Sequence, residues 1–346
     1  MYFTSICESL LRSLDADPEN ISLFGFEIDN YKKNNNNNKR CLHEEMDDAD
    51  DEMDDSMSVN AKRVKLNRPS PIDSDDSLRK VIFVIDEKEY RRIQERSYPL
   101  LEELFSLTLQ WPVGKVAKML SNNDSTDKAI NHNFCFRNSV FDAPLVNIPA
   151  ELKSPITRIP RIIIVLMKSL TKPECLETEG VFRLESSPSK CDYYQKAIDN
   201  LFQSNGEDQA NWLDEVPVNN RTHVLKRYFR KIPGLLVSRA LTVLLYELFV
   251  AYNESDCFSG MICLVLNCLP LENYKALAMV CLLLNLYSEN EQDTKMDDLS
   301  LSKQWALNLF DVPETKEEMA FEVTDCVIKL LHLFIKRWEC FFICKL

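Results

Sequence analysis

Apolar residues recur at helical spacing through most of the chain after Val81. One such stripe repeats at i, i+4, i+7, i+8 and i+11, and it consists of Ile159, Ile163, Leu166, Met167 and Leu170. Residues spaced in this way share one face of an α-helix, so the stripe predicts a helix that buries that face. No segment shows the apolar–polar alternation of a half-buried strand. The pattern predicts an all-α bundle of about eight to nine helices.

The same spacing places the other helices. Two short ones are expected at Tyr98 to Leu109, with Pro99 in its first turn, and at Val113 to Leu120. Proline lacks a backbone N–H and fits the first turn of a helix, so Pro160 marks the start of the striped helix. Further helices are expected at about 189–204, 217–232, 239–252, 257–268, 273–289, 296–309 and 316–339.

Composition divides the chain near residue 80. Residues 1–80 contain 11 basic and 18 acidic residues, a net charge of −7, with a run of asparagines at 34–38 and nine carboxylates between Glu44 and Asp55. Such a segment has too little apolar surface to offset its chain entropy, so we expect a disordered acidic tail. Residues 81–136 are expected to form a short helical pre-domain with a polar linker, and residues 137–346 the main helical domain.

Charge and composition exclude several functions. The whole chain has 41 basic and 54 acidic residues, a net charge of −13, which argues against a surface built to bind nucleic acid or anionic lipid. Six glycines disfavour a glycine-rich nucleotide cradle. No apolar run reaches the roughly 20 residues of a membrane helix, and the N-terminus lacks a secretory signal pattern. We therefore expect an intracellular protein without a transmembrane segment.

Metal and cofactor sites are also not expected. The twelve cysteines include no C-x-x-C pair, and several lie in apolar helical stretches, as buried reduced thiols do. The four histidines are isolated from one another, and none has a carboxylate or cysteine arrangement at convincing ligand spacing; they are His43, His132, His223 and His332. The sequence therefore predicts no metal and no cofactor of the chain's own.

The segment EGVFR at 179–183 interrupts the helical pattern. Gly180 permits a tight backbone turn. Val181 and Phe182 can anchor the segment, and Arg183 would then point outward. A fixed loop of this kind would present a guanidinium to a partner, although an ordinary loop with a solvated arginine has the same composition.

A second segment, LKRYFRKIP at 225–233, combines an apolar face with two basic residues. Lys226 and Arg230 are four residues apart, so they share one helix face and can present paired positive charge. A solvated basic edge is the alternative. The apolar face consists of Leu225, Tyr228, Phe229 and Ile232.

The order and spacing of these segments resemble the Rho GTPase-activating (RhoGAP) domain. EGVFR is followed 43 residues after its arginine by the lysine of LKRYFRKIP, then by LPLEN at 269–273 and by Lys-Met at 295–296. The likeness runs from about Phe141 to the C-terminus. The opening FDAPL at 141–145 is similar to the family's F-G-x-P-L, with Asp142 in place of glycine. The opening and the helices before it most resemble the subgroup represented by Rho GTPase-activating protein 19.

The resemblance implies a RhoGAP-like helical bundle that accelerates GTP hydrolysis by a Rho-family GTPase in its GTP–Mg²⁺ form. Arg183 matches the family's arginine finger, which is supplied in trans to the charge that develops on the phosphoryl oxygens. Gly180 and Phe182 belong to its loop. Lys226 and Arg230 match a basic pair that braces the loop and contacts the GTPase.

The sequence also departs from the family's pattern. Ser300 stands where a GTPase-contacting asparagine is expected, and Leu307 stands where proline is expected. Ser186 replaces a glycine after the finger, and Gly234-Leu235 replaces Glu-Pro. Two alternatives to an activator therefore remain open. One is a module that binds the GTPase without accelerating hydrolysis. The other is a nuclear interaction protein whose acidic tail carries the function.

The tail contains one basic cluster, AKRVKL at 61–66, whose charges are Lys62, Arg63 and Lys65. It resembles a short nuclear localisation signal that importin can bind, which predicts a protein of both cytoplasm and nucleus. The alternative is that it only offsets the acidic run. Phosphorylation would add about −1.5 to −2 charges per site and weaken import. The candidate sites are Ser70, Ser74 and Ser77.

Overall fold

The computed structural model describes six stretches of the chain: 87–121, 140–155, 157–184, 187–203, 212–314 and 317–342. All of them belong to one compact unit, Ser74–Cys344. The basic cluster Lys62, Arg63 and Lys65 and the serines Ser70, Ser74 and Ser77 lie outside the described residues.

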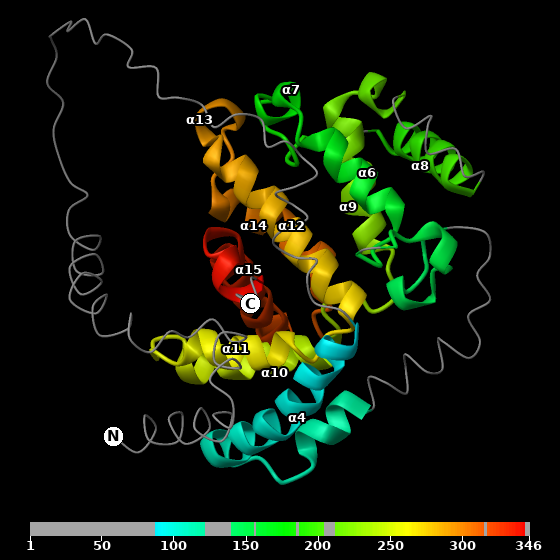
Figure 1. Ribbon diagram of the computed structural model, residues 1–346. Helices are drawn as coiled ribbons and strands as arrows, with labels where there is room; N and C mark the ends of the chain where they lie inside the picture. Colours follow the sequence, from blue (N-terminus) through cyan, green and yellow to red (C-terminus); the bar gives the residue numbers. More distant parts are fainter. Residues whose placement is uncertain are drawn as a thin grey trace, which may run out of the picture. The chain divides into compact units, whose positions relative to one another are not determined.

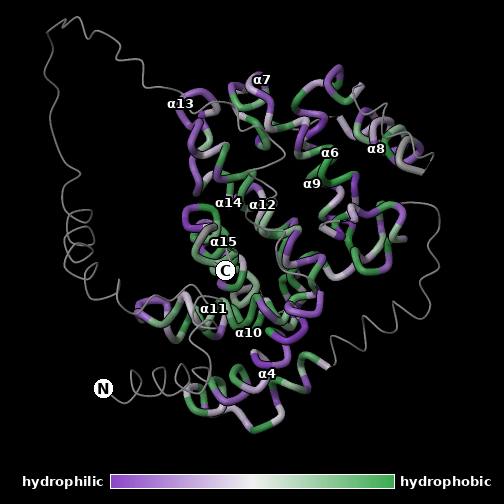
Figure 2. The backbone as a smooth tube through the Cα atoms, in the orientation of Figure 1, coloured by the Kyte–Doolittle hydropathy of each residue, from purple (hydrophilic) through white to green (hydrophobic). Residues whose placement is uncertain are grey.

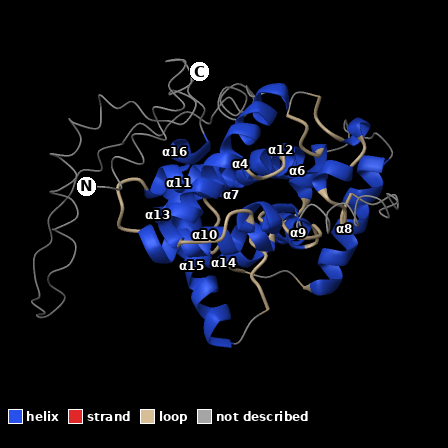
Figure 3. Cartoon of the chain, turned by 90° about the horizontal axis from the view of Figure 1, so that it is seen from below, coloured by secondary structure: helices blue, strands red, loops and turns tan. Residues whose placement is uncertain are grey.

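Every regular element in the described stretches is a helix, which confirms the all-α class (Figures 1 and 3). Two isolated β-bridges, Lys153 with Pro160 and Val237 with Phe310, only tie loops together. From residue 140 onward the longer helices are α6 (Arg161–Leu170), α8 (Pro188–Gln203), α9 (Val218–Arg230), α10 (Arg239–Tyr252), α11 (Phe258–Leu266), α12 (Leu271–Glu289), α14 (Asp298–Leu309) and α15 (Glu317–Lys336).

These helices agree with the periodic segments to within a few residues, and the shorter elements are additions. The helix expected over 316–339 ends at Lys336, and a separate helix follows after Arg337. The added elements are α7 (Pro173–Leu176), α13 (Glu291–Thr294), α16 (Trp338–Phe342) and the 3₁₀ turns η3 (Leu145–Asn147) and η4 (Ala150–Leu152).

The first described helix, α4 (Glu87–Leu109), differs from the prediction. It begins well before Tyr98, so Pro99 lies inside the helix instead of in its first turn. Proline removes one hydrogen bond to the carbonyl four residues earlier, here that of Glu95. Both Pro99 and Glu95 are exposed, so water can satisfy this carbonyl. The buried stripe continues upstream through Tyr90 and Ile93, which explains why the helix extends.

Helix α4 packs against α11 and the loop that follows it. The Tyr90 hydroxyl donates to the Leu269 carbonyl at 3.0 Å, and Gln94 Nε2 donates to the same oxygen at 2.6 Å. The Tyr90 ring also contacts that of Tyr274 on α12, with centroids 5.4 Å apart. The segment before residue 140 therefore shares a core with the helices that follow. Residues 115–121 form a second short helix, close to its expected position.

Helix α12 is the central helix of the described part. Fourteen of its 19 residues are buried, so it presents core on nearly every side, against α14, α15 and α16. Figure 2 shows apolar residues gathered along α10, α11 and α12. The last buried residue of α12 is Tyr287. Its hydroxyl donates to the Leu170 carbonyl at 2.8 Å and so ties α12 to the end of α6. Among the described residues, no helix is both long and apolar enough to cross a membrane.

Candidate functional site

The loop between α7 and α8, described over 177–184 and called the finger loop below, makes a tight turn with Arg183 at its exposed end. Gly180 and Phe182 have φ values of 68° and 64°. The backbone N–H groups of Arg183 and Leu184 both donate to the Gly180 carbonyl, at 3.0 and 3.1 Å. A left-handed conformation costs an L-residue such as phenylalanine about 1–2 kcal/mol. Such strain persists only where the surroundings impose it.

Two contacts hold this turn in place. The Phe182 ring is only 2% exposed and packs edge-on against Tyr287 of α12 and Trp305 of α14, with centroid distances of 4.9 and 5.3 Å. The Gly180 N–H donates to the Thr294 carbonyl at the end of α13, at 2.8 Å. The finger loop is therefore anchored to the α12–α14 region through both a side chain and its backbone.

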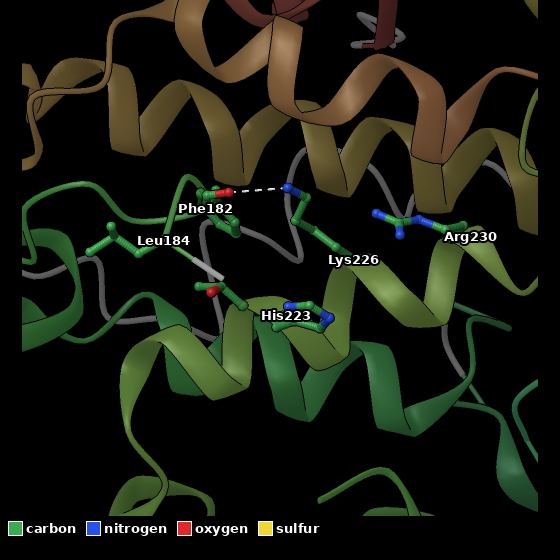
Figure 4. A pocket seen from close by; sticks show the side chains of 6 residues that line it. Phe182, Leu184, His223, Lys226 and Arg230 are labelled. Atoms are coloured by element: carbon green, nitrogen blue, oxygen red, sulfur yellow. Dashed lines mark hydrogen bonds between the residues drawn. The ribbon is translucent and has the colours of Figure 1, made fainter. Parts of the chain in front are cut away.

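The two predicted basic residues of α9 add a third support. Lys226 Nζ donates to the Phe182 carbonyl at 3.0 Å (Figure 4). It also donates to Gln304 Oε1 of α14 at 3.5 Å. Arg230 Nε donates to Asn308 Oδ1 at 2.9 Å. Lys226 thus braces the finger loop, and Arg230 ties α9 to α14.

Between the finger loop and α9 lies a shallow depression, which we call the recess. Figure 4 shows Leu184 on the loop side, with Lys226 and Arg230 one turn apart on α9. The structure thus brings together five of the six predicted site residues, namely Gly180, Phe182, Arg183, Lys226 and Arg230. The recess is lined by Phe182, Leu184, Thr222, His223, Lys226 and Arg230.

The Arg183 side chain is exposed and forms no hydrogen bond or ion pair with any other described residue. A methyl group on Gly180 would lie 3.3 Å from Arg183 Nη2 and from Leu184 Cγ. Glycine at 180 therefore serves the left-handed turn and also leaves room for the arginine above it. This arrangement places an exposed guanidinium on an anchored loop.

Comparisons with known proteins bear on the family of this chain. A family model for the RhoGAP domain matches residues 160–314. Rho GTPase-activating protein gacZ of Dictyostelium discoideum is 30% identical over 196 residues, which is 55% of this chain and 17% of that protein. The family that residues 160–314 match is thus the RhoGAP domain family. The solved structure of human Rho GTPase activating protein 15 shares the fold, with a TM-score of 0.50 at 16% identity, over 62% of this chain and 97% of that one.

The chain thus matches under a fifth of the length of the relative from Dictyostelium. The likeness to the subgroup of Rho GTPase-activating protein 19 stays a prediction.

Ser300, the sixth predicted residue of the RhoGAP site, serves its own helix. Asp297 is the N-cap of α14 and accepts a hydrogen bond from the Ser300 N–H at 2.6 Å. The Ser300 hydroxyl also bonds to Asp297, and these two bonds hold the pKa of that carboxyl below its ordinary value. Ser300 thus serves the start of its own helix.

This cap gives a testable pH dependence. Asp297→Ala should lower the free energy of unfolding by about 1 kcal/mol at pH 7, the usual effect of removing an N-cap. Because the folded-state pKa is lowered, the cap stabilises fully above the unfolded-state pKa of about 3.9 and loses its effect as pH falls through the folded value. Urea unfolding from pH 7 down to pH 3 measures this. A difference between variant and wild type that is constant with pH would contradict the role of the carboxylate.

Two residues of α14 that the sequence analysis missed provide the contacts to α9. Gln304 and Asn308 are four residues apart, so they share the face of α14 that contacts α9. Asn308 is 4% exposed, and its amide also donates to the Gln304 carbonyl at 2.9 Å. Two polar residues four positions apart in an amphipathic helix were the available signal.

Two histidines described as isolated in the sequence have defined surroundings. His223 lines the recess. His332 Nε2 lies 3.2 Å from Asp298 Oδ2 and links α15 to the start of α14. Both placements depend on residues that are far apart in the sequence, so the sequence did not reveal them. In the described stretches, no group of three or more His, Cys, Asp or Glu side chains is arranged to hold a metal ion.

Several departures from the family's pattern lie among the described residues. Asp142 stands in the place of glycine with φ of 64°, a conformation that Asp tolerates better than most residues, and its carboxylate pairs with Lys231 at 3.1 Å. Gly234 and Leu235 both adopt positive φ after α9, at 73° and 57°. Leu307 is 53% exposed on α14, beside the buried Asn308.

Proposed function

We propose that the chain stimulates GTP hydrolysis by a Rho-family GTPase that carries GTP and Mg²⁺, with Arg183 as the arginine finger in trans. The observation that carries this proposal is the exposed Arg183 on a loop held by Phe182, Thr294 and Lys226. In phosphoryl transfer, charge spreads over the γ-phosphoryl and bridging oxygens, and a positioned guanidinium stabilises it. Such a residue accelerates hydrolysis by about 10³- to 10⁵-fold, or roughly 4–7 kcal/mol.

The planar fork of arginine is central to this role. It offers paired N–H donors to two phosphate oxygens, which the single ammonium of lysine does not. The buried Phe182 ring and the Lys226 brace fix the loop before the partner arrives. On insertion only the Arg183 side chain then loses conformational freedom. Little binding free energy is needed to order the loop.

A second candidate function is binding of a Rho-family GTPase without efficient activation. Two observations favour it, namely the Ser300 hydroxyl engaged with Asp297 and the exposed Leu307 in place of proline. Both changes lie on α14 and leave the Arg183 loop intact. This candidate predicts that the chain binds the GTP form while the hydrolysis rate stays that of the GTPase alone.

Single-turnover GTP hydrolysis distinguishes the two. A panel of Rho-family GTPases, each loaded with GTP and Mg²⁺, is followed with and without the full chain. Activation predicts a rate increase that saturates with chain concentration for at least one GTPase. Binding without a rate increase supports the second candidate. Failure to bind any GTPase in the GTP form rules out both.

The tail carries an independent proposal. We infer that residues 61–66 bind importin and distribute the protein between cytoplasm and nucleus, and that phosphate at Ser70, Ser74 or Ser77 weakens this import. Ser70→Asp should then shift a fluorescent fusion toward the cytoplasm, whereas Ser70→Ala should not. Equal distribution of the two variants would refute the effect of charge at this site.

A further inference from the structure

The segment that carries Arg183 starts at the buried end of α6. Helix α6 ends at Leu170, the short helix α7 begins three residues later, and the finger loop follows α7. The last carbonyl groups of a helix have no partners within it, so other elements must supply donors where that end is buried. Ser169 and Leu170 are 5% and 0% exposed. The donors to their carbonyl groups therefore help to set how the chain leaves α6 toward the finger loop.

These donors come from two distant helices. Helix α9 packs against α6 (Figure 1), and Nη1 of its Arg221 donates to the Ser169 carbonyl at 2.6 Å. The Cys175 thiol of α7 donates to the same oxygen at 3.3 Å, so α6, α7 and α9 meet at this atom. The Leu170 carbonyl accepts the hydrogen bond from the Tyr287 hydroxyl of α12.

Helices α9 and α12 also hold the other end of this segment. Lys226 of α9 donates to the Phe182 carbonyl, and the Phe182 ring packs against that of Tyr287. Tyr287 thus contacts the segment twice, with its hydroxyl at the end of α6 and with its ring at the finger loop. Helix α9 does the same with two different side chains, Arg221 and Lys226.

Arg221 is a costly residue to place here. Its side chain is 2% exposed, and its guanidinium lies 3.9 Å from Asp214 Oδ1, while the other oxygen of Asp214 is 2.5 Å from Lys172 Nζ. Arg221 Nε has no hydrogen-bond partner among the described residues. Burial of a charge is offset poorly by a long ion pair, so stability alone favours an apolar side chain at this position. The arginine instead provides the hydrogen bond to Ser169, which no apolar side chain can form.

We propose that Arg221 is a positioning residue for Arg183. Together with the Tyr287 hydroxyl it fixes the end of α6, and so determines where the finger loop presents the guanidinium. Because Arg221 is buried, it acts through the loop and does not touch the GTPase. The effect on hydrolysis rests on the proposed function, whereas the effect on the loop is a property of the chain alone.

Hydrogen–deuterium exchange of the free, full chain tests the effect on the loop. The reporters are the amides of Gly180, Arg183 and Leu184, which donate to backbone carbonyl groups. Arg221→Met keeps an apolar stem but removes the donor. A hydrogen bond to a charged group contributes at least about a factor of ten, so exchange at these amides should rise by about that factor. Arg221→Lys keeps a charged donor and should recover most of the protection.

Single-turnover hydrolysis tests the consequence for activity, with a Rho-family GTPase loaded with GTP and Mg²⁺. Arg221→Met should lower the maximal stimulated rate per folded molecule by about ten- to a hundredfold, as expected for a displaced catalytic group. Its Kd for the GTP form should stay at the wild-type value, because the side chain does not reach the partner. A purely structural role would change the folded fraction and leave the corrected rate unaltered.

Lys153→Met is the matched control. Lys153 is also a buried cation, 7% exposed, that donates to a backbone carbonyl, that of Val146, at 3.1 Å. It pairs with Glu272 at 3.4 Å, at the opposite end of α12 from Tyr287. Its replacement should leave exchange at the finger-loop amides and the corrected hydrolysis rate unchanged.

A second variant keeps the inference testable should Arg221→Met not fold. Tyr287→Phe removes only the other donor to the end of α6 and keeps the ring against Phe182, so it should raise exchange at the same amides. Wild-type exchange at these amides in the folded variant, or an equal rise in Lys153→Met, would overturn the inference and leave the proposed function standing. If the wild-type chain stimulates no Rho-family GTPase, the proposed function fails instead, and the exchange rates still decide whether Arg221 positions the loop.

Discussion

Arg183→Ala should lower GTPase stimulation by about a thousandfold or more, the lower end of the effect of an arginine finger. The free energy of unfolding should change by no more than about 0.5 kcal/mol, as expected for an exposed side chain away from structural contacts. Arg183 is exposed and has no hydrogen-bonding or ionic partner among the described residues. The variant therefore separates the chemistry from the fold, because it removes only the group that enters the partner's site.

Arg183→Lys is the matched variant. It keeps the positive charge and the long apolar stem but loses the planar fork. We expect it to bind the GTP form nearly as well as wild type and to recover only a small part of the lost rate. Single-turnover hydrolysis at saturating chain, together with urea unfolding, measures both properties. Full stimulation by Arg183→Ala would refute the finger mechanism, and full stimulation by Arg183→Lys would show that charge alone suffices.

Apolar periodicity was enough to predict the helical fold and most of its helices. It failed where a helix contained a residue that usually ends one. The buried stripe of α4 runs through Tyr90 and Ile93, yet Pro99 suggested a helix start. The exposed position of Pro99, where water can satisfy the freed carbonyl, becomes clear only when the packing is known. Short helices such as α7 and α13 escaped for another reason, because four residues are too few to show a period.

The sequence predicted only part of the site, because some of its contacts involve backbone atoms or residues of other helices. The acceptor for Lys226 is the Phe182 carbonyl, a backbone atom that no sequence pattern displays. Gln304 and Asn308 of α14 accept hydrogen bonds from Lys226 and Arg230 of α9. A contact between two helices is not revealed by the sequence of either helix alone. His223 was set aside because no ligand lies near it in the sequence, although it lines the recess. The motifs identified the helices and loop of the site, and tertiary packing determined which side chains complete it.

Phe182→Ala should have the second largest effect, because it acts on both stability and activity. Removing a buried phenylalanine side chain costs about 3–5 kcal/mol. Here it also removes the ring that holds a left-handed residue against Tyr287 and Trp305. The loop should then leave its anchored conformation. Since a displacement of about 1 Å can reduce a rate a hundredfold, stimulation per folded molecule should fall by roughly that factor.

Phe105→Ala separates this effect from a general loss of stability. Phe105 is fully buried in α4, packs against Trp111 at 4.8 Å and takes no part in the finger loop. It should lose a similar free energy of unfolding, measured with urea, but keep its stimulation when rates are corrected for the folded fraction. If Phe182→Ala retained the same corrected activity as Phe105→Ala, the ring would be ordinary core. Loss of activity in Phe182→Ala alone would instead mean that the packing of one aromatic side chain determines where the Arg183 guanidinium is presented.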